Sequence, residues 1–340
     1  MKAAVLRRFN TPLSVEETVK PKAGPGEALI KVMASGLCAT DLHIQEGIIP
    51  TIRLPFVPGH EMAGIVEEVG PGVSTYLLGK HMVGYIDVAC HKCRYCRSGR
   101  SNLCTDLIRI GFERDGSHQQ YCTIPAKNVC VIDETIPFEQ AAIVPDAVAC
   151  MLHAVKNIGK VRPGQWVFIL GVGGIGFQGV QLAKFFGAKV IAASRKEKRL
   201  DIARELGADH IVNTSREDLL QCVTKITGGN LCDVVFDLIG NENSVDLAAG
   251  ICCRGGKVVL AAYTTPSFRA NYQEIVIREK ELLGIRGTTP EILAESIDLV
   301  AKGMITPFVY KTMPFDQINE GLEEIRQGTA LGRIVALPWV

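Results

Sequence analysis

A glycine-rich turn between two apolar segments constrains the fold of this chain more than any other feature. The turn reads Gly171-x-Gly173-x-x-Gly176, and the pattern around it predicts a buried strand at 167–170, a helix at 177–186 and a second strand at 190–193. In such a βαβ unit the glycines permit a tight turn, close approach of a pyrophosphate and close helix–strand packing, while the helix N-terminus attracts phosphate. The motif therefore predicts dinucleotide binding, and a turn without a ligand is the weaker interpretation. The expected contacts are Gly171, Gly173, Gly174, Ile175 and Gly176.

The residues after the second predicted strand indicate which dinucleotide is bound. An NAD site usually offers an acidic side chain to the ribose hydroxyls roughly 20 residues past the glycines. Here the strand ends in Ser194-Arg195, and Lys198 follows. A small hydroxyl and cations can bind a 2′-phosphate, which a carboxylate would repel. We therefore predict NADP(H) as the preferred cofactor and NAD(H) as the alternative, in which the cations only cover the start of a helix at 197–206.

Length, charge and hydropathy exclude several classes of protein. The chain has 340 residues, enough for two domains with separate cores, and its net charge of +1 gives no general affinity for nucleic acids or membrane surfaces. No apolar run approaches the ~18 residues of a membrane span, and the N-terminus does not resemble a signal peptide. Twelve cysteines in a large chain of this kind indicate metal ligands or core residues rather than a disulfide scaffold. We expect a cytoplasmic protein with a small-molecule substrate.

The order of the predicted elements divides the chain into a mostly β part and an alternating α/β part. Short strands separated by Pro and Gly turns over residues 1–148 predict a small, partly open β-barrel. From 149 to 287, strands alternate with helices, which predicts a doubly wound parallel sheet. Residues 288–340 contain a predicted helix at 291–302 and are expected to return to the first domain. The predicted strands are 3–6, 28–34, 63–69, 81–86 and 119–124, then 167–170, 190–193, 210–212, 234–238, 257–261 and 282–286.

Four closely spaced cysteines predict a metal site within the first domain. Cys90, Cys93, Cys96 and Cys104 form the pattern Cys-x-x-Cys-x-x-Cys-x7-Cys. Four thiolates at this spacing suit tetrahedral zinc with a closed coordination sphere, whereas the bacterial iron–sulfur run has three residues before its fourth cysteine and then proline. We predict a structural zinc that holds a lobe, at about 88–106, with too little apolar content to fold alone.

A second group of candidate ligands lies earlier in the chain. Gly36-Leu-Cys-Ala-Thr-Asp-Leu-His43 contains Cys38, and Gly59-His-Glu61 contains His60. A thiolate and an imidazole both suit zinc. Two ligands are too few for a metal site, and spacing alone does not identify a third.

Taken in order, these motifs give the chain a family resemblance over essentially its whole length. Cys-x-Thr-Asp-x-His, Gly-His-Glu, the four-cysteine loop and the later Gly-x-Gly-x-x-Gly resemble those of the zinc-dependent alcohol dehydrogenases of the medium-chain dehydrogenase/reductase superfamily. The resemblance implies a GroES-like catalytic domain, a Rossmann domain, an active site in the cleft between them, and a homotetramer or homodimer. The segment Gly332-Arg-Ile-Val335 resembles the closing strand of the family, and Arg333 would there reach a cofactor phosphate.

The resemblance also implies a third ligand for the catalytic metal. The family often places a cysteine just before the helix that links the domains, and the matching position here is Asp146, as in some NADP-dependent members. A carboxylate is a legitimate zinc ligand, although Asp146 could instead cap the helix that follows it. Glu61 could be a fourth ligand at rest that exchanges with water or substrate.

The chemistry implied by the family is hydride transfer between an alcohol, or its aldehyde or ketone, and the nicotinamide. Thr40 would hydrogen-bond the substrate hydroxyl, and His43 would pass the proton to solvent if the two lie on one helical turn. Two alternatives are an NAD-dependent polyol, sugar or hydroxyacyl-thioester dehydrogenase and a non-catalytic nucleotide-binding relative. Asp237 is a weaker candidate for the cofactor site, and His118, His153 and His210 are interpreted as structural. The residues expected to form an apolar substrate pocket are Ile48, Ile49, Ile52, Leu54, Ile110 and Phe112.

Overall fold

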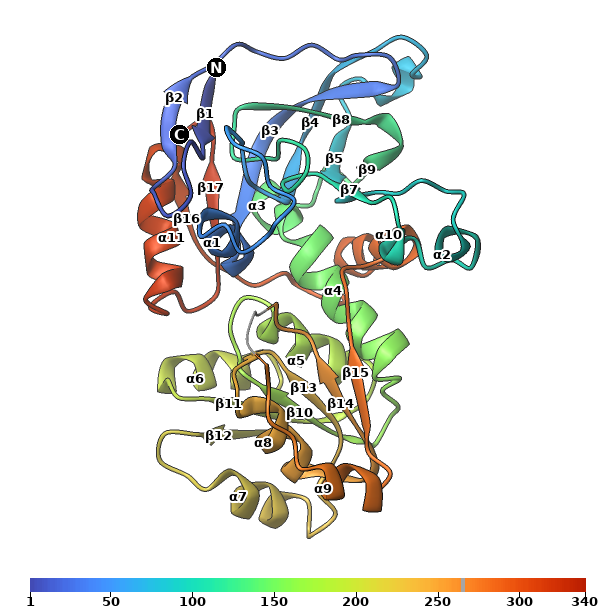
Figure 1. Cartoon of the computed structure of the whole chain (residues 1–340), viewed down its shortest axis with the longest axis vertical. Coiled ribbons are helices and arrows are strands. Elements are labelled where there is room, and N and C mark those ends of the chain that lie inside the picture. The colour runs from blue at the N-terminus through green and yellow to red at the C-terminus, as the bar shows by residue number, and fades with distance from the viewer. Residues whose placement is uncertain (264–266) are drawn as a thin grey trace. The chain divides into compact units, whose positions relative to one another are not determined.

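The computed structural model describes residues 1–263 and 267–340 and divides the chain into two compact units. The first unit contains residues 1–149 and 288–340, and the second contains residues 150–287 (Figure 1). No helix in the described parts of the chain is both long enough and apolar enough to cross a membrane.

The second unit is built on a six-stranded parallel sheet with the order β12-β11-β10-β13-β14-β15. This order places the first strand of the unit, β10, beside the point where the direction of winding reverses, which is the arrangement of a Rossmann fold. The predicted doubly wound sheet is therefore confirmed. Its strands are β10 (Trp166–Leu170), β11 (Lys189–Ser194), β12 (His210–Asn213), β13 (Cys232–Asp237), β14 (Cys252–Leu260) and β15 (Glu281–Gly284). The helices are α5 (Gly176–Phe185), α6 (Glu197–Glu205), α7 (Leu219–Ile226), α8 (Ser244–Ile251) and α9 (Tyr272–Ile277).

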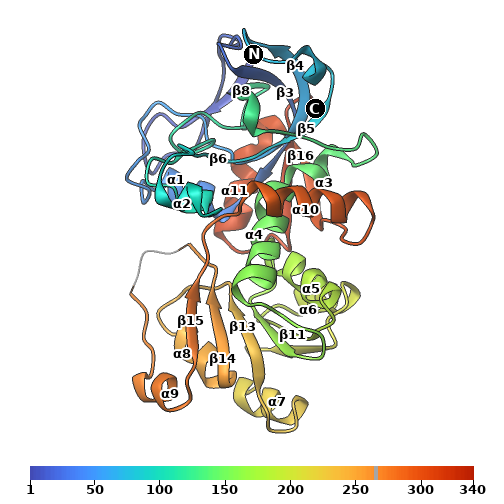
Figure 2. The ribbon, with the colours of Figure 1, turned by 90° about the vertical axis from the view of Figure 1, so that its right-hand side faces the viewer.

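Buried β-branched and aromatic residues explain why these central segments form strands. In β10 and β13, Phe168, Ile169 and Phe236 are fully buried. Strands of a parallel sheet that is covered on both faces read as near-continuous apolar runs, and this is the pattern found in the sequence. Figure 2 shows helices over the sheet formed by β11, β13, β14 and β15.

The first unit is organised around a seven-stranded sheet in which β3 is the longest strand. The sheet has the order β16-β17-β3-β4-β5-β9, and β8 also pairs with β3. Its strands are β3 (Glu27–Leu37), β4 (Glu61–Val69), β5 (His81–Gly84), β8 (Tyr121–Pro125), β9 (Val129–Val131), β16 (Val309–Pro314) and β17 (Arg333–Leu337). Two smaller sheets pair β1 (Lys2–Val5) with β2 (Ser14–Glu17), and β6 (Asp87–Val88) with β7 (Ile108–Arg109).

Short helices connect the strands of the first unit. They are α1 (Ala39–Gln45), α2 (Arg94–Arg97), α3 (Phe138–Ala142), α10 (Pro290–Ala301) and α11 (Ile318–Arg326). The segment after α3 is a turn of π-helix, η4 (Val144–Val148), and it continues into α4 (Ala149–Leu152) and η5 (His153–Ile158). Single π-helical turns concentrate at functional sites, and η4 carries Asp146.

The C-terminal segment is part of the sheet of the first unit. β17 pairs antiparallel with the end of β3, so that Val335 lies opposite Gly36. On the other side of β3, Gly36 lies opposite Glu61, the first residue of β4. Segments from both ends of the chain therefore meet where β3 ends, and the candidate ligands lie at that place.

Candidate active site

Strand pairing at the end of β3 brings the predicted ligands of the second metal group together. Cys38 follows β3 and caps the start of α1, and His60 directly precedes β4. Asp146 lies on η4. One donor atom from each of Cys38, His60, Glu61 and Asp146 lies within 4.8 Å of the others.

The spacing and the chemistry of these donors fit a zinc ion. The Asp146 Oδ2 atom lies 3.9 Å from Cys38 Sγ and 3.8 Å from His60 Nε2. Tetrahedral zinc with bonds of about 2.0–2.3 Å places its ligand atoms roughly 3.3–3.8 Å apart, so only a small contraction is needed. Cys38, His60 and Glu61 are buried and Asp146 is partly buried, and two carboxylates and a thiol face a single guanidinium, that of Arg333. A divalent cation would balance this acidic surplus, which is otherwise costly in a buried place.

The pKa values of Cys38, Asp146 and Glu61 are shifted because these ionisable groups lie close together. Burial raises the pKa of the Cys38 thiol, but the nearby Arg333 and His60 outweigh it, so the pKa lies below its ordinary value. Hydrogen bonding to His60 and the charges of His60 and Arg333 similarly overcome burial and hold the pKa of Asp146 well below its usual range. Burial raises the pKa of Glu61 well above its usual range, and Asp146 and Cys38 add to the effect. Cys38 and Asp146 are therefore favoured as anionic donors, whereas Glu61 is the more easily protonated member.

Arg333, which is predicted to reach a cofactor phosphate, lies at this cluster in the structure. Its Nη2 atom lies 2.6 Å from Glu61 Oε1 and 2.9 Å from Asp146 Oδ2. Arg333 begins β17, and the pairing of β17 with β3 carries its side chain to this place. This contact could not be predicted from the sequence, because its partners are distant in the chain.

The structure also brings in Asp41, which sequence reasoning did not select. Asp41 Oδ2 accepts a hydrogen bond of 2.8 Å from the Cys38 backbone N–H, which closes a capping box at the start of α1. Asp41 Oδ1 lies 3.4 Å from His60 Nδ1, the ring nitrogen that faces away from Asp146. A carboxylate in this position orients a metal-binding imidazole and increases its basicity. The spacing Cys38-x-x-Asp41 could have indicated this role, because it matches the spacing of a capping box at the start of a helix.

Thr40 and His43 lie one helical turn apart on α1, as the prediction of a helical turn required. Thr40 Oγ1 lies 3.4 Å from Cys38 Sγ and is therefore next to the predicted metal ligand. His43 is half-buried; burial lowers its pKa, and Glu46 partly offsets this. A lowered pKa keeps the imidazole neutral near physiological pH, so that it can accept a proton.

Most of the apolar residues proposed for a substrate pocket are part of the core. Ile49, Ile52 and Phe112 are buried in one cluster, and Leu54 packs against it. Ile110 belongs to a second cluster, and Ile48 is partly exposed. The Phe112 ring lies 5.2 Å from the His60 ring, centroid to centroid, so this side chain borders the ligand cluster.

The four cysteines of the predicted lobe also converge. Their sulfur atoms all lie within 4.8 Å of one another; Cys93 and Cys96 are 3.5 Å apart, and Cys90 and Cys96 are 4.0 Å apart. Tetrahedral zinc with bonds of about 2.3 Å would place sulfur atoms about 3.8 Å apart. Backbone N–H groups of Cys96 and Thr105 lower the pKa of Cys93 to about 6, which favours the thiolate that a metal needs. All twelve cysteines lie in the described residues, and all are free thiols.

The glycine-rich turn has the geometry that a dinucleotide requires. It follows β10, and Gly171 has a φ of +99°, which favours glycine. A Cβ at Gly176 would lie 2.4 Å from the Gly171 carbonyl oxygen, whereas a Cβ at Gly173 would meet nothing closer than 3.9 Å. The backbone N–H groups of Gly174 and Ile175 have no acceptor within the described residues. The turn therefore leaves open backbone next to the N-terminus of α5, where a pyrophosphate fits.

The residues expected to distinguish NADP from NAD follow β11. Ser194 is buried at the end of the strand, and Arg195 and Lys198 are exposed. Arg199, which was not selected from the sequence, has its guanidinium 3.9 Å from the place of a Cβ at Gly173. Burial and the nearby positive charge of Arg195 both lower the pKa of Arg199. Asp237, the weaker candidate for the cofactor site, accepts hydrogen bonds from Ser244 Oγ and the Ile239 N–H and so stabilises the loop after β13.

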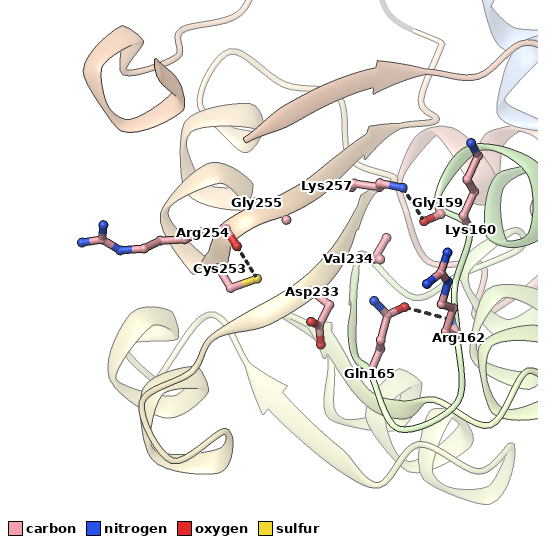
Figure 3. A pocket seen from close by; sticks show the side chains of 11 residues that line it. Gly159, Lys160, Arg162, Gln165, Asp233, Val234, Cys253, Arg254, Gly255 and Lys257 are labelled. Atoms are coloured by element: carbon pink, nitrogen blue, oxygen red, sulfur yellow. Dashed lines mark hydrogen bonds between the residues drawn. The ribbon is translucent and has the colours of Figure 1, made fainter. Parts of the chain in front are cut away.

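A separate cavity of about 170 Å³ lies in the second unit (Figure 3). Its lining includes Gln165 and Asp233, near the amino ends of β10 and β13, with Lys257 beside them in β14. Since the glycine-rich turn lies at the carboxyl end of β10, this cavity is distinct from the predicted cofactor site. The side chain of Arg254, which also borders the cavity, points away from it (Figure 3).

Comparison with family models and with known sequences agrees with this geometry. Residues 24–134 match the alcohol dehydrogenase GroES-like domain, and residues 174–302 match the zinc-binding dehydrogenase domain. An alcohol dehydrogenase of Geobacillus stearothermophilus is 34% identical over 337 residues, which is 98% of this chain and 99% of the relative. An L-threonine 3-dehydrogenase of Rhizobium etli (strain CIAT 652) is 32% identical over 346 residues, covering 100% of this chain and 99% of the relative.

Solved structures give the same result. An NAD-dependent alcohol dehydrogenase superposes with a TM-score of 0.95 at 28% identity, covering 99% of both chains. A putative zinc-binding dehydrogenase from Sinorhizobium meliloti 1021, solved with NADP bound, superposes with a TM-score of 0.92 at 30% identity, again covering 99% of both chains. The chain thus belongs to the zinc-binding alcohol dehydrogenase family of the medium-chain dehydrogenase/reductase superfamily, with a GroES-like domain and a Rossmann domain. Both the fold class and the family predicted from the motifs are confirmed.

Proposed function

We propose that this chain is a zinc-dependent dehydrogenase that transfers a hydride between an alcohol, or its aldehyde or ketone, and a nicotinamide cofactor. The observation that carries the proposal is the convergence of Cys38, His60, Glu61 and Asp146 donor atoms within 4.8 Å. Cys38, His60 and Asp146 would hold the catalytic zinc, with Glu61 as an exchangeable fourth ligand, and the four lobe cysteines would hold a structural zinc.

The proposed mechanism assigns binding and proton transfer to residues of this chain. When bound, zinc would supply a Lewis acid and the nicotinamide ring would accept or donate the hydride. The Thr40 hydroxyl, 3.4 Å from Cys38 Sγ, would hydrogen-bond the substrate hydroxyl and orient it. The proton would leave through Thr40 Oγ1 to the half-buried His43 ring and then to solvent. The pyrophosphate would rest on the Gly174 and Ile175 N–H groups.

The experiment that tests the activity is a panel of alcohols and carbonyl compounds assayed with both nicotinamide cofactors. We expect a change of nicotinamide absorbance with uncharged alcohols or ketones. The panel must contain L-threonine and simple polyols, because the match to an L-threonine 3-dehydrogenase favours a hydroxy amino acid as the second candidate substrate. No activity with any alcohol or carbonyl in a zinc-loaded preparation would favour a non-catalytic relative and would contradict the proposal.

The cofactor preference has a test of its own. Substituting Arg195→Leu should raise the KM for NADPH about 10- to 100-fold, since one charge-assisted hydrogen bond to phosphate is worth roughly 1.5–3 kcal/mol. The KM for NADH should change little. Arg204→Leu is the matched control, because Arg204 is an exposed cation at the far end of α6 and pairs with Asp201. A strong preference of the unmodified protein for NADH would defeat the prediction of NADP(H).

We also propose that the protein is cytoplasmic and assembles as a homodimer or homotetramer. β15 is an edge strand of the second unit, and an edge strand offers unpaired backbone groups to another chain. In the same unit α9 exposes large apolar side chains, with Tyr272 78% and Ile277 68% exposed. Light scattering should give a mass of two or four chains, and a mass of one chain at micromolar concentration would contradict the assembly.

A further inference from the structure

A buried carboxylate lies between two histidine rings behind the ligand cluster. Asp41 Oδ1 is 3.4 Å from His60 Nδ1, and Asp41 Oδ2 is 3.5 Å from His118 Nε2. Asp41 is 1% exposed and His118 is fully buried, so water does not compete for these contacts. No partner of His118 could be predicted from the sequence. In the structure Asp41 lies between His118 and the predicted metal ligand His60.

His118 is itself fixed by a second contact on its other ring nitrogen. Ser35 Oγ, in β3, lies 2.8 Å from His118 Nδ1 and 2.6 Å from Ser117 Oγ. The backbone leaves little freedom here, because a Cβ at Gly59 would lie only 2.7 Å from His118 Nδ1. Gly59, with a φ of +104°, therefore leaves the space that the His118 ring occupies beside the Gly59-His60-Glu61 segment.

The two contacts together define how His118 can hold Asp41. In the tautomer in which Nδ1 accepts a hydrogen bond from Ser35 Oγ, the ring proton lies on Nε2, which is 3.5 Å from Asp41 Oδ2. Asp41 then lies between His60 Nδ1 and His118 Nε2, and its Oδ2 atom also accepts the hydrogen bond from the Cys38 N–H. A phenylalanine could fill the same volume but could not hold the carboxylate.

We propose that His118 is a positioning residue of the metal centre: it holds Asp41 against His60 and so sets the zinc affinity of the Cys38–His60–Asp146 site. This inference rests on the proposed function of that site. Partners that orient a ligating histidine typically change metal affinity by about 10- to 100-fold when they are removed. The effect should therefore be visible in metal binding itself, independently of turnover.

The test compares zinc binding by the full-length protein and its His118→Phe variant, measured by competition with a chromophoric chelator. The variant should bind one of its two zinc ions about 10- to 100-fold more weakly. The four-cysteine site serves as an internal reference and should keep its affinity. When cobalt(II) replaces zinc at the weakened site, its visible absorption spectrum should be shifted from that of cobalt(II) in the unmodified protein. His118→Gln, whose amide can donate to Asp41 and accept from Ser35, should recover most of the affinity.

Cys122→Ala is the control for a general loss of packing, because Cys122 is buried in another core cluster of the same unit and its thiol contacts the Asp115 and Thr123 carbonyls. Thermal unfolding of both variants reports their stability. Should His118→Phe fail to fold, Ser35→Ala is expected to weaken the same zinc site by up to about tenfold. Unchanged zinc affinity in His118→Phe, or equal weakening by an equally destabilised Cys122→Ala, would overturn the positioning role. An unmodified protein that binds zinc only at the four cysteines would instead contradict the proposed function.

Discussion

The Asp146→Asn variant is expected to lose one zinc per chain and at least about 10³-fold in kcat/KM, which corresponds to about 4 kcal/mol of transition-state stabilisation. The amide has almost the same shape but no charge, and Asp146 is the donor that lies between Cys38 Sγ and His60 Nε2. Its loss also removes one of the two carboxylates that face Arg333. The measurement is the zinc content of the purified variant beside its turnover with the best alcohol of the panel.

Asp316→Asn is the matched control, because Asp316 is an exposed aspartate of the same unit that pairs with Lys2. It should keep both zinc ions and full activity. Normal zinc content together with near-normal turnover in Asp146→Asn would remove Asp146 from the ligand set and would favour its alternative role as a helix cap. The same comparison applies to Cys38→Ser, for which we expect an equally large loss.

Two alanine substitutions in the glycine-rich turn should separate cofactor binding from stability. Gly173→Ala places a methyl group in open space, 3.9 Å or more from other atoms, where the pyrophosphate is expected to lie. We expect unchanged thermal unfolding but at least about tenfold weaker nicotinamide nucleotide binding, or about 1.4 kcal/mol. Gly176→Ala places a Cβ 2.4 Å from the Gly171 carbonyl oxygen, so α5 must shift. This variant should lose about 1–3 kcal/mol of stability as well as affinity.

Gly250→Ala is the control for both variants. Gly250 lies in α8, and a Cβ there would meet no atom within 4 Å. Nucleotide affinity can be followed by the quenching of protein fluorescence, and stability by thermal unfolding. Unchanged affinity in Gly173→Ala would show that the nucleotide does not approach this turn, and the assignment of the cofactor site would then be wrong.

The fold of the second unit could be predicted because its elements are specified locally. The apolar run before Gly171 forms β10, and the strands that follow have the predicted positions with ends shifted by a few residues. The fold of the first unit was harder to predict from the sequence, because its sheet joins strands from distant parts of the chain. Short segments such as β9 (Val129–Val131) and β16 (Val309–Pro314) lack a strong periodic pattern and were not predicted individually.

The same distinction decides which residues of the candidate site could be predicted: those that are close together in the sequence could be, and those that meet only in the fold could not. Cys90 to Cys104 lie within one loop, so their spacing alone indicated a shared metal. Cys38 and His60 were selected for their chemistry, whereas Asp146 entered only through a family resemblance, since nothing in its own segment distinguishes a ligand from a cap. Strand pairing and packing, which are invisible in the sequence, decided that Arg333 meets Glu61 and that His118 meets Asp41.

The measurement that tests the central claim most directly is stepwise removal of zinc during an assay of hydride transfer. The purified protein should contain two zinc ions per chain. A chelator that removes the more accessible ion should abolish the change in nicotinamide absorbance in proportion to the zinc released, and added Zn²⁺ should restore it. Full activity in protein from which both zinc ions have been removed would contradict the account.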